Sequence, residues 1–199
     1  MLENIKEWQE GLGAVVGFVG LIVVTQVTLW DARRRNRRSK QEQTLSVAVA
    51  IYGEMLLLRE KMASLGKAAS RLYVRNGLHG GDYFDSHFVH RFNLPDPHLY
   101  PALASKVGEL PADLVRAITR FYFSYSEAQK WLPMIVPDEN RPFEYGVNYV
   151  LDPILSAVVE IEPALVQIEF MGAITPAASR PDLGETESVI EMIEDMWGN

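Results

Sequence analysis

The sequence predicts an all-α protein, with one N-terminal transmembrane helix followed by a cytoplasmic domain built like a helical hairpin or bundle. Three observations predict this fold class. Residues 12–30 carry no charged side chain, residues 33–40 hold five arginines and one lysine, and apolar residues recur at three- and four-residue steps through much of 41–171. Such steps place the apolar side chains on one face of a helix.

The uncharged stretch 12–30, LGAVVGFVGLIVVTQVTLW, is the predicted transmembrane helix. With a rise of about 1.5 Å per residue, its 19 residues extend over about 28 Å, close to the hydrocarbon thickness of a bilayer. Trp8 and Trp30 bracket it, as interfacial aromatic side chains do. Residues 1–11 contain three acids and one lysine, unlike the positive start of a cleaved signal peptide. We expect them to form a short extracytoplasmic N-terminus.

The basic juxtamembrane segment, residues 31–40, predicts the orientation of the chain. By the positive-inside rule it stays in the cytoplasm, so the N-terminus is outside and the rest lies on the cytoplasmic side of the inner (plasma) membrane. The same cations are expected to contact the headgroups of anionic lipids. They are Arg33, Arg34, Arg35, Arg37, Arg38 and Lys40.

Three small residues, Gly13, Gly17 and Gly20, line one side of the predicted membrane helix. Small residues at this spacing let two helices approach closely in lipid. We therefore expect a helix–helix contact here, either with a second copy or with another membrane subunit.

The helical cytoplasmic domain, residues 41–171, begins with a proline-free stretch that predicts a long helix up to Asn76-Gly77. Its apolar or small residues follow the heptad pattern, but Arg59 and Gly66 interrupt the seam. A long stable coiled coil is therefore not expected. The seam comprises Leu45, Ala48, Tyr52, Met55, Met62, Ala69 and Tyr73.

A loop-like stretch rich in histidine and aspartate, 79–98, follows this helix. It contains His79, His87, His90 and His98, interleaved with Asp82, Asp85 and Asp96. Imidazole and carboxylate groups are metal ligands, and His87 and His90 would share one face of a helical turn. The spacing matches no defined metal motif. We therefore predict surface and packing roles, with a metal site at His87 and His90 as the alternative.

A helical hairpin is predicted next. Asp96-Pro97 or Tyr100-Pro101 begins its first helix, which ends at Gly108, and Leu110-Pro111 begins the second. Leu114, Ile118, Phe121, Tyr122 and Tyr125 share one face of that second helix and are expected in the core.

Residues 143–171 are predicted to be helical, with Asp152-Pro153 and Glu162-Pro163 as caps or kinks. Glu160, Glu162 and Glu169 are expected on a solvated face. The predicted core residues are Leu151, Ile154, Leu155, Val158, Val159, Ile161, Leu165, Val166 and Ile168.

The chain continues with a flexible linker, 172–184, and an acidic amphipathic tail, 185–199. The apolar stripe of this tail is Val189, Ile190, Ile193, Met196 and Trp197. Such a helix with an aromatic anchor is typical of segments that bind a groove on a partner. The alternative is a terminal helix that docks on its own domain.

One segment, LYPALASKVGELPADLVRAITRFYFSYSEA (99–128), resembles a stretch of uncharacterised small bacterial single-pass inner-membrane proteins. The resemblance implies one N-terminal membrane helix, a basic flank and a helical cytoplasmic domain. It implies no activity and no catalytic residues.

The composition excludes several classes of functional site and partner. The chain contains no cysteine, which excludes thiolate metal sites and cysteine nucleophiles. The net charge is −7 although 33–40 carry +6, so the remainder is strongly acidic and we expect no nucleic-acid partner. No phosphate-binding loop, dinucleotide turn or nucleophile elbow occurs.

We therefore expect a membrane-anchored, non-enzymatic interaction protein, acting as a scaffold, a regulator or an accessory subunit of a membrane complex. Its expected partners are membrane lipid and either another protein or a second copy of itself, without a cofactor. The alternative is a membrane-anchored metal-dependent enzyme that uses loop 79–98. A membrane-bound sensor also stays open.

Overall fold

The computed structural model describes residues 2–77, 84–136, 145–176 and 180–197; within them, the side chains of 2–27, Leu29, Asp31, Asn76, Gly77 and Trp197 are not described. These residues form helices and turns and no strand, which confirms the all-α class. The chain divides into two compact units, Met1–Gln43 and Thr44–Asn199, which are described separately.

The first unit is the N-terminal part of helix α1 (Leu2–Gly77). Gly13, Gly17 and Gly20, with residues 12–27 of the predicted membrane helix, lie outside the residues whose side chains are described. Among the side chains that are described, no helix contains an apolar stretch long enough to cross a membrane. The membrane span and its glycine contact therefore stay predictions.

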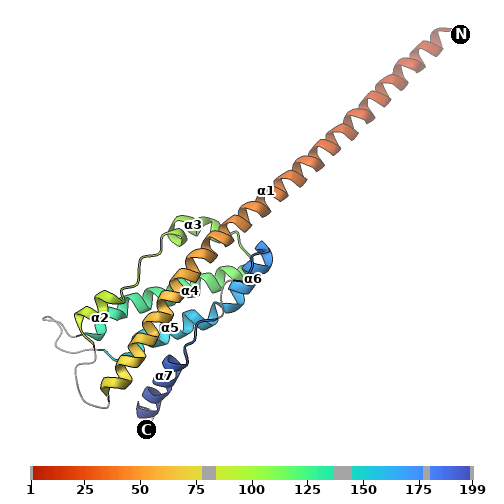
Figure 1. Cartoon of the computed structure of the whole chain (residues 1–199). Coiled ribbons are helices and arrows are strands. Elements are labelled where there is room, and N and C mark those ends of the chain that lie inside the picture. Colours follow the sequence, from red (N-terminus) through yellow and green to blue (C-terminus); the bar gives the residue numbers. More distant parts are fainter. Residues whose placement is uncertain (1, 78–83, 137–144, 177–179, 198–199) are drawn as a thin grey trace. The chain divides into compact units, whose positions relative to one another are not determined.

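The second unit is a helical domain (Figure 1). It contains the remainder of α1 and a series of shorter helices. These are α2 (Ser86–Arg91), α3 (Leu99–Val107), α4 (Ala112–Trp131), the 3₁₀ turn η1 (Leu132–Ile135), α5 (Asn148–Glu160), α6 (Glu162–Gly172) and α7 (Gly184–Trp197). Among the shorter helices, α4 and α5 pack most extensively against each other.

The predicted seam on α1 is the buried face of that helix within the second unit. Five of its members are less than 9% exposed, namely Ala48, Tyr52, Met55, Met62 and Ala69. Arg59 and Gly66, which interrupt the apolar pattern, are buried on the same face. The seam therefore packs against other helices of the chain's own domain, and the two interruptions are points of close contact.

Several helix boundaries were correctly predicted. Helix α1 ends at Gly77, α3 is followed by Gly108, and α4 starts directly after Pro111 with Asp113 in its first turn. The five aromatic and aliphatic residues predicted for the buried face of α4 are all at most 5% exposed. An acidic side chain in the first turn also interacts favourably with the helix dipole.

The region 143–171 differs from the prediction in one respect. Asp152-Pro153 does not begin a helix, because α5 starts at Asn148 and Pro153 lies inside it. Pro153 is the sixth residue, so only one backbone hydrogen bond near the start of the helix is lost. The second proline acts as predicted, since α6 begins at Glu162 with Pro163 in its first turn. Val166, predicted for the core, is 54% exposed.

Gly66 provides a sharp test of the packing around α1. A Cβ atom there would lie 3.1 Å from Ile154 Cγ2 and 3.2 Å from Thr186 Oγ1, whereas a Cβ at Gly53 on the same helix would meet nothing within 4 Å. We expect Gly66→Leu to lower the free energy of unfolding by about 1–3 kcal/mol through overpacking. Gly53→Ala should raise it by up to about 1 kcal/mol through helix propensity. Urea denaturation of the purified full-length chain measures both, and equal effects would contradict this packing.

Candidate interaction surface

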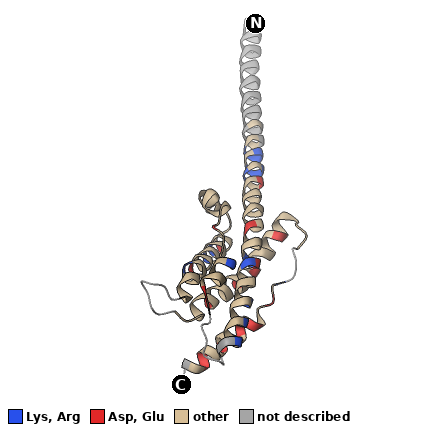
Figure 2. Cartoon of the chain, turned by 60° about the vertical axis from the view of Figure 1, so that its left-hand side comes forward, with Lys and Arg blue, Asp and Glu red and all other residues tan. Residues whose placement is uncertain are grey.

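The basic segment is exposed along α1. Every residue from Ala32 to Lys40 is exposed. In Figure 2 the arginine and lysine residues of this segment form a basic stretch on the helix. The guanidinium of Arg34 lies 5.5 Å from the ring centroid of Trp30, whose side chain is 64% exposed. Such a cation–π contact holds the Arg34 side chain against the exposed indole ring.

The described histidines of loop 79–98 lie at the surface. His87 and His90 are exposed on α2, and His98 is exposed before α3. Asp85 caps α2 by accepting a hydrogen bond from the backbone N–H of Phe88 at 2.7 Å, and Asp96 accepts one from Gln129 at 2.8 Å. Among the described residues there is no group of three or more potential ligands placed to hold a metal ion. His79 and Asp82 lie outside those residues.

A carboxylate on α1 holds the start of α3. Glu54 Oε1 accepts hydrogen bonds from the backbone N–H of His98 and of Leu99, both at 2.6 Å. Its Oε2 accepts one from the N–H of Tyr100 at 3.0 Å and one from the hydroxyl of Tyr122 at 2.6 Å. No side chain of α3's own flank caps this helix, so Glu54 supplies the cap that sequence-local residues normally provide.

These hydrogen bonds determine the charge state of Glu54. Burial raises the pKa of this carboxyl group, but the hydroxyl of Tyr122 and the three backbone N–H groups together lower it below its ordinary value. Burial and the neighbouring Glu54 carboxylate raise the pKa of Tyr122. The ring of Tyr122 stacks on that of Tyr100 with 4.0 Å between centroids. The pair thus joins α1, α3 and α4 with Glu54 ionised and Tyr122 neutral.

Of the three glutamates predicted for a solvated face, Glu160 is exposed and Glu162 and Glu169 are half-buried, and all three also contact other helices. Glu162 forms an ion pair with the buried Arg59 of α1, whose Nε also donates to the carbonyl oxygen of Val158. Glu160 pairs with Arg120 of α4 at 2.6 Å. Glu169 accepts a hydrogen bond from the hydroxyl of Tyr52 at 2.6 Å. Each carboxylate therefore ties α5 or α6 to α1 or α4.

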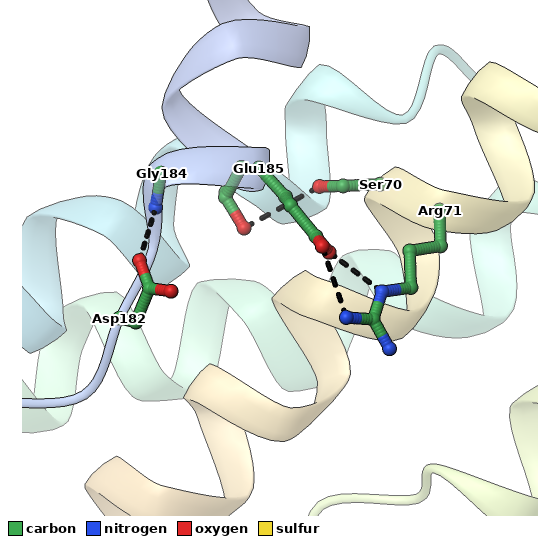
Figure 3. Close-up of polar contacts among 6 residues, drawn as sticks. Ser70, Arg71, Asp182, Gly184 and Glu185 are labelled. Carbon is green, nitrogen blue, oxygen red and sulfur yellow. Dashed lines mark hydrogen bonds and ion pairs between the residues drawn. The ribbon is translucent and has the colours of Figure 1, made fainter.

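The amphipathic tail docks on the domain as α7. Figure 3 shows its first turn beside α1, where Arg71 Nε and Nη2 donate to the two carboxylate oxygens of Glu185 at 2.7 and 2.9 Å. The hydroxyl of Ser70 lies 3.3 Å from that of Thr186 in a buried contact. Just before the helix, Asp182 accepts a hydrogen bond from the N–H of Gly184 at 3.0 Å. The hydrogen bonds from Arg71 lower the pKa of Glu185.

The apolar stripe of the tail divides into two parts. Val189, Ile190 and Ile193 are 1%, 8% and 7% exposed, so in this fold they belong to the domain core. Met196 is 58% exposed, and the side chain of Trp197 lies outside those described. Near the two ends of the predicted linker, Ile174 packs on the core and Leu183 is buried. This matches the alternative of a helix that docks on its own domain, and the three buried side chains are not available to a partner in this arrangement.

Sequence reasoning missed Glu54, Arg59 and the carboxylates of α5 and α6 as contact residues. Their partners lie between 40 and 117 residues away, and neither periodicity nor local capping rules reach that far. The interruption of the α1 seam at Arg59 was the only signal.

No family model matches the chain, and neither a curated protein nor a solved structure matches it.

Removing the charge of Glu54 should destabilise the domain in a pH-dependent way. The amide of a glutamine has one oxygen that accepts hydrogen bonds, whereas its NH2 group donates them. If this NH2 group replaces Oε2, it faces the backbone N–H of Tyr100 and the hydroxyl of Tyr122, both of which donate to Glu54. We expect Glu54→Gln to lower the free energy of unfolding by about 1–2 kcal/mol at pH 7. Because folding lowers the pKa of Glu54, this stabilisation is present above the ordinary carboxyl pKa of 4.5 and is lost as the pH falls through the folded value.

Urea denaturation at a series of pH values measures this difference. Glu60→Gln, the same change at an exposed position six residues further along α1, is the matched control and should have little effect. A deficit of Glu54→Gln that stays constant down to pH 3 would contradict the assignment.

Two variants separate the forces that hold α7. Ile193→Ala should destabilise the docked helix by about 2–4 kcal/mol because it removes buried methyl groups. Arg71→Gln should change its stability little, since the Arg71–Glu185 pair is exposed to solvent and exposed pairs contribute weakly. Hydrogen exchange of the backbone amides of α7 reports the opening of this helix. A larger effect from Arg71→Gln would mean that the ion pair and not apolar burial holds the tail.

Proposed function

We propose that this chain is a membrane-anchored, non-enzymatic interaction protein that places a helical domain at the cytoplasmic face of the inner membrane. One observation carries the proposal: the uncharged residues 12–30 are followed at once by six cations within residues 33–40. The uncharged part of such a helix is stable in lipid because its backbone hydrogen bonds are satisfied internally. The cations that follow it stay on the cytoplasmic side and so determine its orientation. The exposure of the basic segment supports a contact with anionic headgroups.

The polar side chains of the domain support an interaction role over catalysis. Glu54, Glu162 and Glu169 each bind a group on another helix of the same domain. In loop 79–98, Asp85 caps a helix and Asp96 binds Gln129. These acids therefore have structural partners, and the exposed helical surface is the part of the domain left to meet another molecule.

Membrane fractionation of cells that make the full-length chain tests the anchor. We expect the chain in the membrane pellet, resistant to high salt and released by detergent, because about 19 uncharged residues in lipid are held far more tightly than a surface-bound basic patch. A chain lacking residues 12–30 but keeping the six cations should move to the soluble fraction in high salt. Recovery of the full-length chain in the supernatant would refute the proposal.

A second variant tests the orientation. Replacement of all six cations of 33–40 by glutamine should leave the chain in the pellet but place a fraction of the domains outside, because the positive charge that sets the orientation is gone. Protease accessibility of a C-terminal epitope in intact spheroplasts measures that fraction. The unaltered chain should be protected, and cleavage of its epitope would contradict the cytoplasmic placement.

A further inference from the structure

A hollow of about 350 Å³ with polar side chains along it lies between α4 and α5. Arg116, Arg120 and Ser124 line it from α4, and because they follow one another at four-residue steps they share one face of that helix. Ser156 and Glu160 line it from α5 at the same spacing. The apolar residues that line it are Ala117, Phe121, Ala157 and Ile161. Its volume is in the range of small-molecule sites and far exceeds the room that one water needs.

One buried hydroxyl at this hollow lacks a hydrogen-bond partner. Within the described part of the chain, the buried serine, threonine and charged residues are Arg59, Ser70, Ser124 and Thr186. Arg59 binds α5 and α6, and Ser70 contacts Thr186. Ser124 is 8% exposed, and its hydroxyl forms no hydrogen bond with a residue that the structure describes. Serines in helices often use the carbonyl oxygen one turn earlier, as Ser188 does on α7.

A buried hydroxyl without a partner costs free energy, and its usual explanation is an oxygen atom supplied by water or by a ligand. The hollow that Ser124 lines has room for more than water. The other polar groups along it therefore indicate which ligand would supply that oxygen.

The two arginines of the hollow keep hydrogen-bond donors for a second partner. Arg120 pairs with Glu160 through Nε at 2.6 Å, and Arg116 forms a looser pair with Asp113 at 3.5 Å. The two arginine side chains are 67% and 79% exposed, and a guanidinium carries five N–H donors. Because the arginines are one helical turn apart, both are placed to hold the same anionic group.

The charges around the hollow favour a carboxylate as that group. Asp113 and Glu160 also line it, so a single negative charge meets less repulsion there than a phosphate dianion does. The two oxygens of a carboxylate also match the planar fork of a guanidinium. Ser124 lies about 6 Å beyond Arg120 along the helix, so a second oxygen of the ligand is needed to reach its hydroxyl. The apolar lining suits the hydrocarbon between these two groups.

We propose that the hollow between α4 and α5 binds a small organic acid that carries one carboxylate and one further oxygen, a hydroxyl or a carbonyl. The carboxylate accepts hydrogen bonds from Arg116 and Arg120, the further oxygen meets the hydroxyl of Ser124, and the hydrocarbon between them packs on Phe121. Such a ligand contacts α4 and α5 together and therefore stabilises the folded domain.

This inference goes beyond the proposed function and does not depend on the membrane anchor. The two fail separately. A chain that pellets with membranes but binds no organic acid refutes the ligand site and leaves the anchor in place, whereas a soluble chain that binds one does the reverse.

Saturation-transfer NMR on the purified full-length chain in detergent micelles tests the site. The probes are levulinate, para-hydroxybenzoate and para-hydroxyphenylacetate, which hold a carboxylate and a second oxygen at different separations. We expect at least one of them to bind, and its uncharged amide to bind about tenfold more weakly because the amide lacks the charge that the arginines recognise. Partition into the micelle would favour the amide, so it cannot produce this preference.

Two variants assign the two ends of the ligand. Arg116→Gln should raise the Kd about tenfold for para-hydroxybenzoate and equally for benzoate, which lacks the second oxygen. Ser124→Ala should raise it about fivefold for para-hydroxybenzoate and leave benzoate unchanged, because benzoate has no group at Ser124. If para-hydroxyphenylacetate is the tighter probe, phenylacetate replaces benzoate in this comparison. Arg91→Gln, the same change at an exposed position of α2, is the control for Arg116→Gln and should leave every Kd unchanged.

Urea denaturation without a probe checks the fold of the variants. Ser124→Ala should not lower the free energy of unfolding, since the hydroxyl that it removes has no partner in the described chain. The proposal would be overturned if no probe bound more tightly than its amide, or if Ser124→Ala weakened the probes with and without the second oxygen equally. Tighter binding of inorganic phosphate than of any probe would overturn the class of ligand.

Discussion

The buried face of α1 within the second unit is the constraint on which the rest of the domain depends. One helix supplies Tyr52 to α6, Glu54 to α3 and α4, Arg59 to the junction of α5 and α6, and Arg71 to α7. Tyr52 and Arg59 lie on the buried face of α1 among fully buried methionines and alanines, whereas Glu54 is partly exposed and Arg71 is exposed. Apolar burial provides most of the stability, whereas the polar contacts determine where each shorter helix lies.

The sequence predicted the helices well but said little about their partners. Glycine and proline marked the ends of α1, α3 and α4, and helical periodicity identified the buried face of α4, because those signals act over a few residues. The cap of α3 could not be predicted, since Glu54 precedes it by more than forty residues. Asp152-Pro153 was misread for a related reason: a favourable local cap was overridden by a helix that starts one turn earlier.

The candidate interaction surface was predicted only in its composition. Three of the five residues of the predicted apolar stripe of α7 are buried, but periodicity does not say whether such a stripe covers its own domain or another protein. Docking buries Val189, Ile190 and Ile193 and leaves Met192 and Met196 exposed beside Arg75. The exposed surface beside Arg75 therefore exists only after α7 has folded onto α1, and a free tail would not form it.

The position of α7 over Gly66 also affects how the domain is made in the cell. Ser70 and Thr186 are 116 residues apart, and at a synthesis rate of 5–20 residues per second roughly 5–25 s separate their appearance. Throughout that interval the surface of α1 around Gly66 and Ser70 lacks the helix that covers it. Contacts of such long sequence separation also form slowly. A nascent chain of this protein would thus be a natural client for chaperones that recognise exposed apolar surface.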